Sequence, residues 1–352
     1  MCIRDSTDTN YLSEAWRSGL GTNVGSLNSI KTSDIDNDGE DELIFGNSQG
    51  FVHILEWDSE NQGWKDNFHS VDMGGSVKGM DIAQIDDDPQ LEIAIGYNWV
   101  SDIGKVKIID GITLEAEANW STGVSWSHPG SSTAGWPYGL AMGDLDGDDR
   151  AEIAMGDDTG ILWVVDSETP EKYVGRDITR DEAEWYVDVG IEIGLGSLED
   201  LWGVTFGQFD EDEALEVAVG SKQGWIVLLD GETEEIQWKY DMDNDINDFS
   251  LCYSLIAADL DGDDIDELIV PQQERLSVFI DGGGDGGDDQ EPDSSSIIHK
   301  NDIKSGYGME SINLFGNSNE ELIVADRNGN IKIIGLVGSN LNTYQEWSSG
   351  YT

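Results

Sequence analysis

Three acidic loops in the sequence place carboxylates where they could hold a divalent cation. Each has the form Asp-x-Asp-x-Asp-x-x-x-Glu, with acidic side chains at positions 1, 3, 5 and 9. In a tight loop these carboxylates can converge on one hard cation, and Ca²⁺ accepts about six to eight oxygen ligands with loose geometry. Zinc would require nitrogen or sulfur. The predicted Ca²⁺ ligands are Asp34, Asp36, Asp38 and Glu42 in loop one, Asp144, Asp146, Asp148 and Glu152 in loop three, and Asp259, Asp261, Asp263 and Glu267 in loop five.

Three weaker copies of the loop alternate with these. Loops two and four begin with the neutral Gln84 and Gln208, so we expect weaker sites there. Loop six begins at Asn313 and has the apolar Phe315 at position 3, so we expect no metal. A glutamate at position 9 occurs in all six copies, which predicts that it also braces the loop backbone. The weaker candidate ligands are Asp86, Asp88 and Glu92 in loop two and Asp210, Asp212 and Glu216 in loop four.

The loops belong to a repeat of four short strands. Their first residues are at positions 34, 84, 144, 208, 259 and 313, a period typical of a solenoid or a propeller. An apolar stretch precedes each loop, a run rich in Val and Ile follows it, and a third strand comes after a turn. A fourth, more polar strand often carries a tryptophan, as at Trp120, Trp185, Trp238 and Trp347. We predict an all-β propeller with six recognisable four-stranded antiparallel blades.

The repeated loop, followed by an apolar strand and a glycine, resembles the FG-GAP/VCBS repeat family, whose calcium-loop propellers include the integrin α-subunit head. The resemblance covers roughly residues 28–347. It implies a calcium-binding propeller that serves as a binding or adhesion module. Residues 15–19 also resemble residues 346–350, the fourth strand of the last blade. This surplus strand predicts that the repeats are a fragment of a seven- or eight-bladed ring.

The composition bounds the domains and the partners. Residues 1–13 precede the repeats and begin with what looks like a gene-calling scar, and residues 14–352 form the propeller, with a disordered acidic insertion at 282–296. The net charge of −55, from 18 basic and 73 acidic residues, argues against nucleic acid and anionic membranes. No apolar run is long enough for membrane insertion. Low-affinity calcium loops suit millimolar Ca²⁺, so we expect an extracellular or cell-surface protein.

A set of aromatic residues marks a candidate ligand face opposite the calcium loops. Four of them stand six residues before a loop, at the start of the innermost strand, and others lie in the turn near residue 99 and the long connection 122–138. Two interpretations stay open: the rings pack between blades, or they form a rim that binds a glycan or a protein ligand. The residues are Trp99, Trp126, His128, Trp136, Tyr138, Trp202, Tyr253 and Tyr307.

The sequence favours binding over catalysis. It contains no Gly-x-Ser-x-Gly elbow, phosphate loop or paired Cys and His, so we predict no catalytic residues. The predicted function is a calcium-binding module for a glycan or protein ligand. One alternative is a lyase-like enzyme that degrades polysaccharides, which a basic residue in the central funnel would favour; Lys78 is the candidate at the rim. The other alternative is a purely structural spacer in a large surface protein.

Overall fold

The computed structural model describes residues 30–58, 63–64, 69–85, 89–99, 103–113, 126–127, 139–156, 160–166, 184–196, 200–211, 214–242, 254–272, 275–283, 292, 295–303, 308–316, 318–326, 328 and 330–348. These residues form six four-stranded antiparallel sheets, each ordered so that neighbouring strands are hydrogen-bonded. The prediction of an all-β propeller with six four-stranded blades is confirmed.

Blades one to three contain the following elements. Blade one has β1 (Ile30–Ser33), β2 (Glu42–Gly46), β3 (Phe51–Leu55) and β6 (His69–Asp72), with a small side hairpin of β4 (Trp57–Asp58) and β5 (Gly63–Trp64). Blade two has β7 (Val77–Ala83), β8 (Glu92–Trp99), β9 (Ile103–Asp110) and β10 (Trp126–Ser127). Blade three has β11 (Leu140–Gly143), β12 (Glu152–Gly156), β13 (Ile161–Val165) and β14 (Trp185–Asp188), followed by the short helix α1 (Val189–Glu192).

Blades four to six repeat this arrangement. Blade four has β15 (Leu201–Gly207), β16 (Glu216–Ser221), β17 (Trp225–Asp230) and β18 (Ile236–Asp241). Blade five has β19 (Ile256–Ala258), β20 (Glu267–Pro271), β21 (Leu276–Phe279), the 3₁₀ turn η3 (Ile280–Gly283) and β22 (Ile297–Lys300). Blade six has β23 (Gly308–Ile312), β24 (Glu321–Ala325), β25 (Asn330–Val337) and β26 (Asn340–Ser348).

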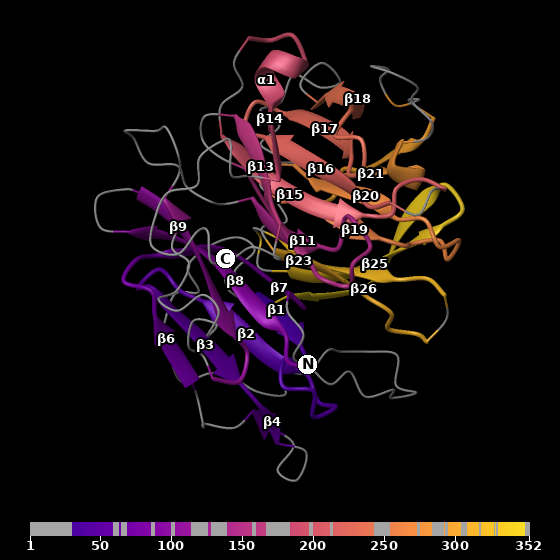
Figure 1. Ribbon diagram of the computed structural model, residues 1–352. Helices are drawn as coiled ribbons and strands as arrows, with labels where there is room; N and C mark the ends of the chain where they lie inside the picture. Colours follow the sequence, from indigo (N-terminus) through magenta and orange to yellow (C-terminus); the bar gives the residue numbers. More distant parts are fainter. Residues whose placement is uncertain are drawn as a thin grey trace.

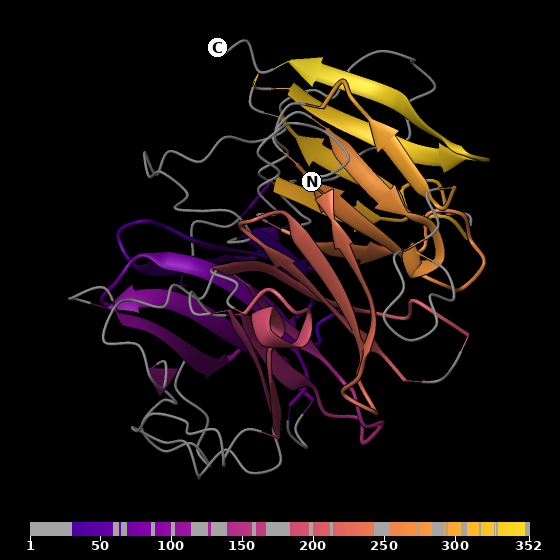
Figure 2. The ribbon, with the colours of Figure 1, turned by 90° about the horizontal axis from the view of Figure 1, so that it is seen from above.

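The sheets stand around a common centre, with the first strand of each blade innermost (Figure 1). Consecutive inner strands contact each other from β1 through β7, β11, β15 and β19 to β23. Figure 2 shows the same blades from above, with the first blade in indigo and the last in yellow. Each loop connects the first strand of its blade to the second, so all six loops lie on one face of the ring.

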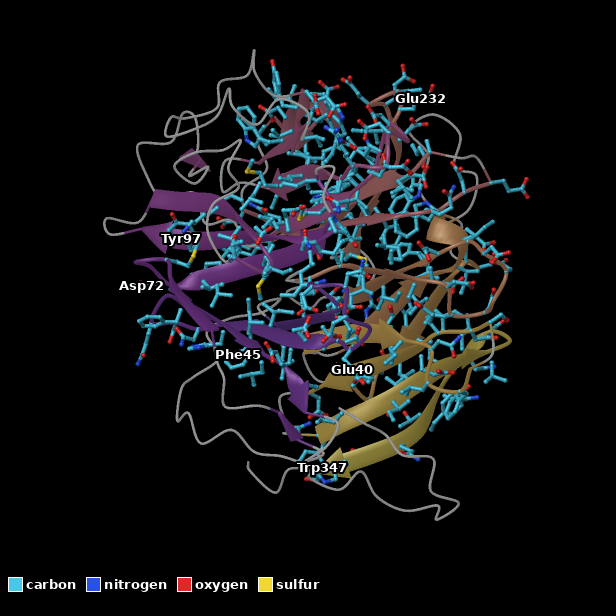
Figure 3. All side chains as sticks on the ribbon, turned by 60° about the horizontal axis from the view of Figure 1, so that its bottom comes forward. Glu40, Phe45, Asp72, Tyr97, Glu232 and Trp347 are labelled. Atoms are coloured by element: carbon cyan, nitrogen blue, oxygen red, sulfur yellow. The ribbon has the colours of Figure 1, made fainter. Side chains whose placement is uncertain are left out.

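The core lies between the blades and not within them. Five hydrophobic clusters fill the five spaces between consecutive blades, from blades one and two to blades five and six. The second and third strands are buried on both faces, as β12 and β13 of blade three show. Trp238 of blade four stacks on Phe279 of blade five with ring centroids 5.4 Å apart. Exposed charges such as those of Glu40 and Glu232 stand on the turns (Figure 3).

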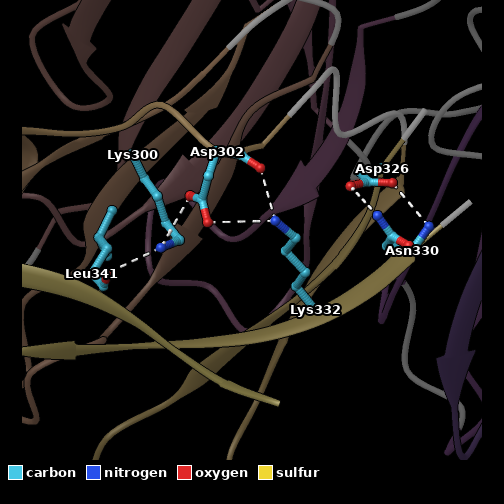
Figure 4. A network of polar contacts seen from close by, with 6 residues as sticks. All are labelled: Lys300, Asp302, Asp326, Asn330, Lys332 and Leu341. Carbon is cyan, nitrogen blue, oxygen red and sulfur yellow. Dashed lines mark hydrogen bonds and ion pairs between the residues drawn. The ribbon is translucent and has the colours of Figure 1, made fainter. Parts of the chain in front are cut away.

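A polar clamp joins the outer parts of blades five and six. Lys300 of β22 forms an ion pair with Asp302 at 3.1 Å and donates to the carbonyl oxygen of Leu341 in β26. Lys332 of β25, only 5% exposed, donates to the carbonyl oxygen of Asp302 at 2.8 Å. Lys300 of blade five and Lys332 of blade six therefore both pair with Asp302 (Figure 4). Because Lys332 is buried, this pairing satisfies a charge that would otherwise be costly.

Several predictions about particular segments can be compared with these elements. Trp185, Trp238 and Trp347 lie in fourth strands as predicted. Trp126 was wrongly placed in a long connecting loop: it lies in β10 and pairs with Val106 as part of the outer strand of blade two. The physical reason is that Trp126 is an aromatic residue, which favours strands, and that it pairs with the outer edge of β9. Trp120, residues 1–29 and most of the 282–296 insertion lie outside the described residues.

The fourth strand of blade six is supplied by the C-terminal repeat itself, since β26 runs to Ser348. The predicted surplus strand at residues 15–19 lies outside the described part of the chain. Membership of a larger ring therefore stays a prediction. Within the described residues, no helix has the length and apolar character needed to cross a bilayer.

Candidate metal centres and the opposite face

Loops one, three and five each bring together three of the four predicted carboxylates; Asp38, Asp148 and Glu267 lie outside the three groups. In each loop, three acidic residues place one oxygen atom apiece within 4.8 Å of the others. The sets are Asp34, Asp36 and Glu42; Asp144, Asp146 and Glu152; and Asp259, Asp261 and Asp263. Three or more carboxylate oxygens at this separation match the donor type that a hard divalent cation prefers.

The loop backbone is shaped by its own aspartates. In loop one, the two oxygens of Asp34 accept hydrogen bonds from the backbone N–H groups of Asp38 and Gly39. Asp144 and Asp259 accept from the equivalent groups in loops three and five. Positions 4 and 6 have left-handed backbone in all three loops, which favours the Gly, Asn and Asp residues found there. The three loops therefore share one turn that needs no metal to be specified.

The glutamate at position 9 braces every loop, as predicted. Its Oε2 accepts a hydrogen bond from the backbone N–H at position 2, at 2.6 to 3.0 Å, in all six blades. Each glutamate is also the first residue of its blade's second strand. The brace therefore fixes the loop to the sheet. The six residues are Glu42, Glu92, Glu152, Glu216, Glu267 and Glu321, and all are at most 3% exposed.

Burial raises the pKa values of the bracing glutamates in loops one, three and five. Burial raises the pKa of Glu42 to about 7, and nearby Asp36 and Asp38 add to the effect. Burial likewise raises the pKa of Glu152 to about 8 and that of Glu267 to about 8. The aspartates at position 3 follow the same trend: burial and the adjacent position-5 carboxylate raise the pKa of Asp36, Asp146 and Asp261. A bound dication would reverse these shifts, because it stabilises the charged form.

Loop five has a buried carboxylate oxygen that a cation would satisfy, and the glutamates of the weaker loops two and four bury the same oxygen. Glu267 is fully buried, and its Oε2 accepts from the Leu260 N–H. Its other oxygen, Oε1, is buried without a hydrogen-bond partner. A buried carboxylate oxygen that accepts no hydrogen bond is costly unless another positive group meets it. Ca²⁺ held by Asp259, Asp261, Asp263 and Glu267 would satisfy it.

Loops two and four use their first residue differently. The side-chain amide of Gln84 donates to the carbonyl oxygen of Gln90, and that of Gln208 donates to the carbonyl oxygen of Asp210. The carboxylate of Asp210 also accepts from Gln237. In both loops an N–H donor therefore meets oxygens that a cation would otherwise use. Asp86, Asp88 and Asp212 lie outside the described residues, so metal binding by these two loops stays a prediction.

Neighbouring loops are tied to each other by backbone hydrogen bonds. The N–H of position 8 donates to the first-position carbonyl of the preceding loop in three cases: Ala151 to Gln84, Asp266 to Gln208, and Glu320 to Asp259. Leu91 makes the corresponding bond to Ile35, one residue further along loop one. Across these four interfaces, neighbouring loops hold each other as well as their own blades.

On the opposite face, one predicted rim aromatic can be placed. Trp202 is the extra residue of a β-bulge between Leu201 and Gly203, and the ammonium of Lys222 lies 5.1 Å from its ring centroid. Lys78 is the extra residue of the matching bulge in blade two. A bulge re-aims one side chain out of the ladder. The small residue that follows is required because a Cβ on Gly203 would collide with Leu255 of the next blade.

Of the other predicted rim residues, the structure describes only Trp99 and Trp126. Trp99 ends β8, at the tip of the long β8–β9 hairpin on the face opposite the loops. His128, Trp136, Tyr138, Tyr253 and Tyr307 lie outside the described residues. The structure therefore brings Trp202 and Lys222 together and leaves the full rim as a prediction.

Sequence reasoning missed two apolar side chains on this face. Ile191 and Leu195, in and after helix α1, are 58% and 48% exposed. They join blade three to blade four, close in sequence to Trp202. The signal was weak because residues 189–195 lack the aromatic residues on which the rim was predicted.

Sequence reasoning also missed a charged cluster in the central channel. Lys31 of β1 forms an ion pair with Asp81 of β7 at 3.2 Å. The other oxygen of Asp81 accepts from the Met142 N–H of β11. The charge of Asp81, and then that of Glu310 on β23, raises the pKa of Lys31 well above its usual range. These residues belong to four different blades, and each lies on an innermost strand. Charged residues in the predicted innermost strands were the sequence signal that could have revealed the cluster.

Comparisons with known proteins confirm the fold and leave the family open. No protein-family profile matches the chain, and no curated protein matches it. Solved propeller structures do match. They include BBS1N in complex with ARL6DN, at 11% identity and a TM-score of 0.57, covering 88% of this chain and 79% of that one.

Two further structures are similar to the same degree. A chain of the mitotic checkpoint complex matches at 10% identity and a TM-score of 0.57, covering 98% of this chain and 89% of that one. Sqt1 of Saccharomyces cerevisiae matches at 9% identity and a TM-score of 0.56, covering 87% and 70%. At such low identity these similarities establish the propeller fold.

These neighbours contradict one expectation. They are intracellular propeller proteins, so the prediction of an extracellular or cell-surface location was wrong by this comparison. Loop spacing predicts calcium binding, but it does not determine whether a protein lies inside or outside the cell.

Proposed function

We propose that this chain is a calcium-stabilised propeller of the FG-GAP/VCBS type that binds a protein partner on the face opposite its loops. The observation that carries the metal half is the recurrence of one loop geometry in blades one, three and five, with a buried, unsatisfied carboxylate oxygen in blade five. Calcium would rigidify one face of the ring and leave the other free for binding.

The binding half rests on exposed side chains. Trp202 is half-buried beside Lys222, whose ammonium is paired with Asp200 at 2.6 Å, and the exposed Ile191 and Leu195 supply apolar contacts on the face opposite the loops. Aromatic anchors of this kind dominate protein interfaces. The similar propellers are likewise found in assemblies: one in complex with ARL6DN and one in the mitotic checkpoint complex. We therefore favour a protein over a glycan as the ligand.

The lyase-like alternative has one observation in its favour: burial lowers the pKa of Lys78, its candidate base at the rim. The channel cluster adds nothing to it. Catalysis by Lys31 as a base would require a neutral amine, yet the carboxylate of Asp81 holds its pKa above the usual range. Lys31 instead ties blade one to blade two. We propose a non-enzymatic role.

Calorimetric titration with Ca²⁺ tests the metal half. We expect at least three sites, each lost separately in Asp36→Ala, Asp146→Ala and Asp261→Ala, while Asp41→Ala, an exposed loop residue, leaves the number unchanged. Melting temperatures should rise with Ca²⁺, because a ligand that binds only the folded state stabilises it. If Ca²⁺ produces neither heat nor a change in melting, the metal half is wrong.

Pull-down with mass spectrometry, run beside a glycan array, tests the binding half. A protein partner retained by the wild type should be weakened by Trp202→Ala and by Ile191→Ser, with calcium stoichiometry unchanged. Truncating a buried interface aromatic costs on the order of 2 kcal/mol or more. Capture of glycans alone would replace the protein ligand with a sugar, and capture of nothing would favour the spacer.

A further inference from the structure

Blade six has a sheet face that shares no hydrophobic cluster with blade one among the described residues, although Ile333 at its middle is buried. The five hydrophobic clusters of the described chain join blades one to six in sequence, and none joins blade six back to blade one. Met309 of β23 packs toward blade five. Because side chains alternate along a strand, Glu310 and Ile312 face the other way.

That face carries four large, exposed apolar side chains. Phe315 is 62% exposed, Val337 50%, Ile312 44% and Tyr344 42%. The rings of Phe315 and Tyr344 meet edge to face with centroids 5.7 Å apart, and Tyr344 lies over Gly335, two residues before Val337. We call these four residues the blade-six patch. Contiguous exposed apolar side chains rimmed by polar ones commonly mark an interaction site.

An ordered turn presents Phe315 outward. Loop six keeps the two braces of the other loops: Glu321 accepts from the Leu314 N–H at 3.0 Å, and Asn313 accepts from the Gly316 N–H at 2.6 Å. Gly316 has the left-handed backbone of position 4. Phe315 therefore stands where loops one, three and five present an aspartate. Over positions 1 to 4 the loop keeps the turn of the others, with an apolar side chain in place of a metal ligand at position 3.

The negative charge around the blade-six patch indicates which kind of partner it would bind. Loop five lies directly beside the patch, because the Glu320 N–H donates to the Asp259 carbonyl and the Asn319 amide donates to the Leu260 carbonyl. With a net charge of −55, a second copy of this chain would be repelled, whereas a cationic partner would be attracted.

We propose that the blade-six patch docks a cationic protein segment in which arginine or lysine alternates with apolar side chains. Apolar residues would cover Ile312 and Val337, and guanidinium groups would stack on Phe315 and Tyr344 and approach the nearby carboxylates. This inference rests on the proposed role as a protein-binding propeller and adds a second surface and a partner chemistry.

The test measures binding of two labelled probes to the full chain by fluorescence anisotropy at physiological salt. One probe is a peptide of alternating arginine and leucine, and the other is oligolysine of equal charge. Phe315→Ser and Tyr344→Ser should each weaken the arginine–leucine peptide about tenfold or more, as expected for loss of an anchor residue, and leave oligolysine unchanged. Ile112→Ser is the matched control, since Ile112 is 48% exposed on the loop face of blade two.

Other outcomes overturn the proposal. If the two probes bind alike and neither variant matters, the attraction is non-specific charge alone. If the wild type dimerises in sedimentation and Phe315→Ser abolishes the dimer, the occupant is a second copy. A chain that does not bind the arginine–leucine peptide has the patch covered by its own remainder. If only Trp202→Ala weakens the peptide, the opposite face is the binding surface, and the proposed function stands without the patch.

Discussion

Loops five and six are neighbours built on the same turn, yet they present opposite chemistry. Both are braced by a buried glutamate at position 9 and capped by the residue at position 1. Loop five gathers three aspartate oxygens, whereas loop six presents Phe315. The comparison teaches that the brace and the metal ligands are separable: the brace makes the turn, and positions 3 and 5 decide what the turn holds.

The largest expected effect on this comparison is that of pH without calcium. Burial raises the pKa values of Glu42, Glu152 and Glu267 to about 7 or 8. A carboxyl whose folded pKa is raised stabilises the fold fully below its unfolded pKa and loses that contribution as pH rises through the folded value. The metal-free chain should therefore lose stability between about pH 4.5 and pH 8, measured by urea denaturation.

Two controls separate these glutamates from general self-repulsion. Saturating Ca²⁺ should flatten the pH profile, because it stabilises the charged carboxylates. Replacing Glu42, Glu152 and Glu267 together by Gln should shrink the metal-free slope, since Gln still accepts the backbone hydrogen bond but does not titrate. An unchanged slope in that variant would assign the effect to the other acidic residues.

Removing the brace itself should come next in size. Glu321→Ala leaves the half-buried Leu314 N–H without its acceptor, which costs about 1 kcal/mol whether or not Ca²⁺ is present. Glu267→Ala should cost a similar amount in metal-free buffer and more in Ca²⁺, since it also loses a ligand. Equal losses for both variants in Ca²⁺ would show that Glu267 only braces.

Removing a pure ligand should matter only with metal. Asp261→Ala should leave metal-free stability nearly unchanged, because its side chain lies in an exposed turn. At a Ca²⁺ concentration 100 times the Kd, loss of one site removes about 2.7 kcal/mol. Thermal melting with and without Ca²⁺ measures both. A large metal-free loss would make Asp261 a structural residue of the turn.

The smallest change should create a site. Gln84→Asp removes the amide that donates to the Gln90 carbonyl and supplies an acidic residue at position 1, the ligand position that lacks one in loop two. We expect calorimetry to count one more Ca²⁺ than in wild type, with little change in metal-free stability. Gln49→Asp, on a turn outside the loops, adds the same charge and should leave the count unchanged.

The parts of the fold that depend on local spacing could be predicted. The six loops, the strands around them and the bracing glutamates each depend on residues within about ten positions, and the structure confirms them. Trp126 failed for a related reason: its neighbours look like a loop, and its strand pairing depends on a free edge supplied by Val106.

Contacts between blades could not be predicted from one sequence. The ion pair of Lys31 with Asp81 joins residues 50 positions apart, and either residue alone reads as an exposed charge. The absence of metal from loop six stays a prediction, and the exposure of Phe315 depends on which face of blade six is covered. Such facts follow from how sheets are arranged, which periodicity does not encode.

The hydrogen bonds between neighbouring loops have an evolutionary consequence. Because the N–H of position 8 is tied to the preceding blade, a loop that loses its acidic residues by mutation is still held in place from outside. Loops two and six, which begin with Gln84 and Asn313 and keep this bond, illustrate such drift. A ring built this way can acquire new surface chemistry one blade at a time while its neighbours preserve the shape.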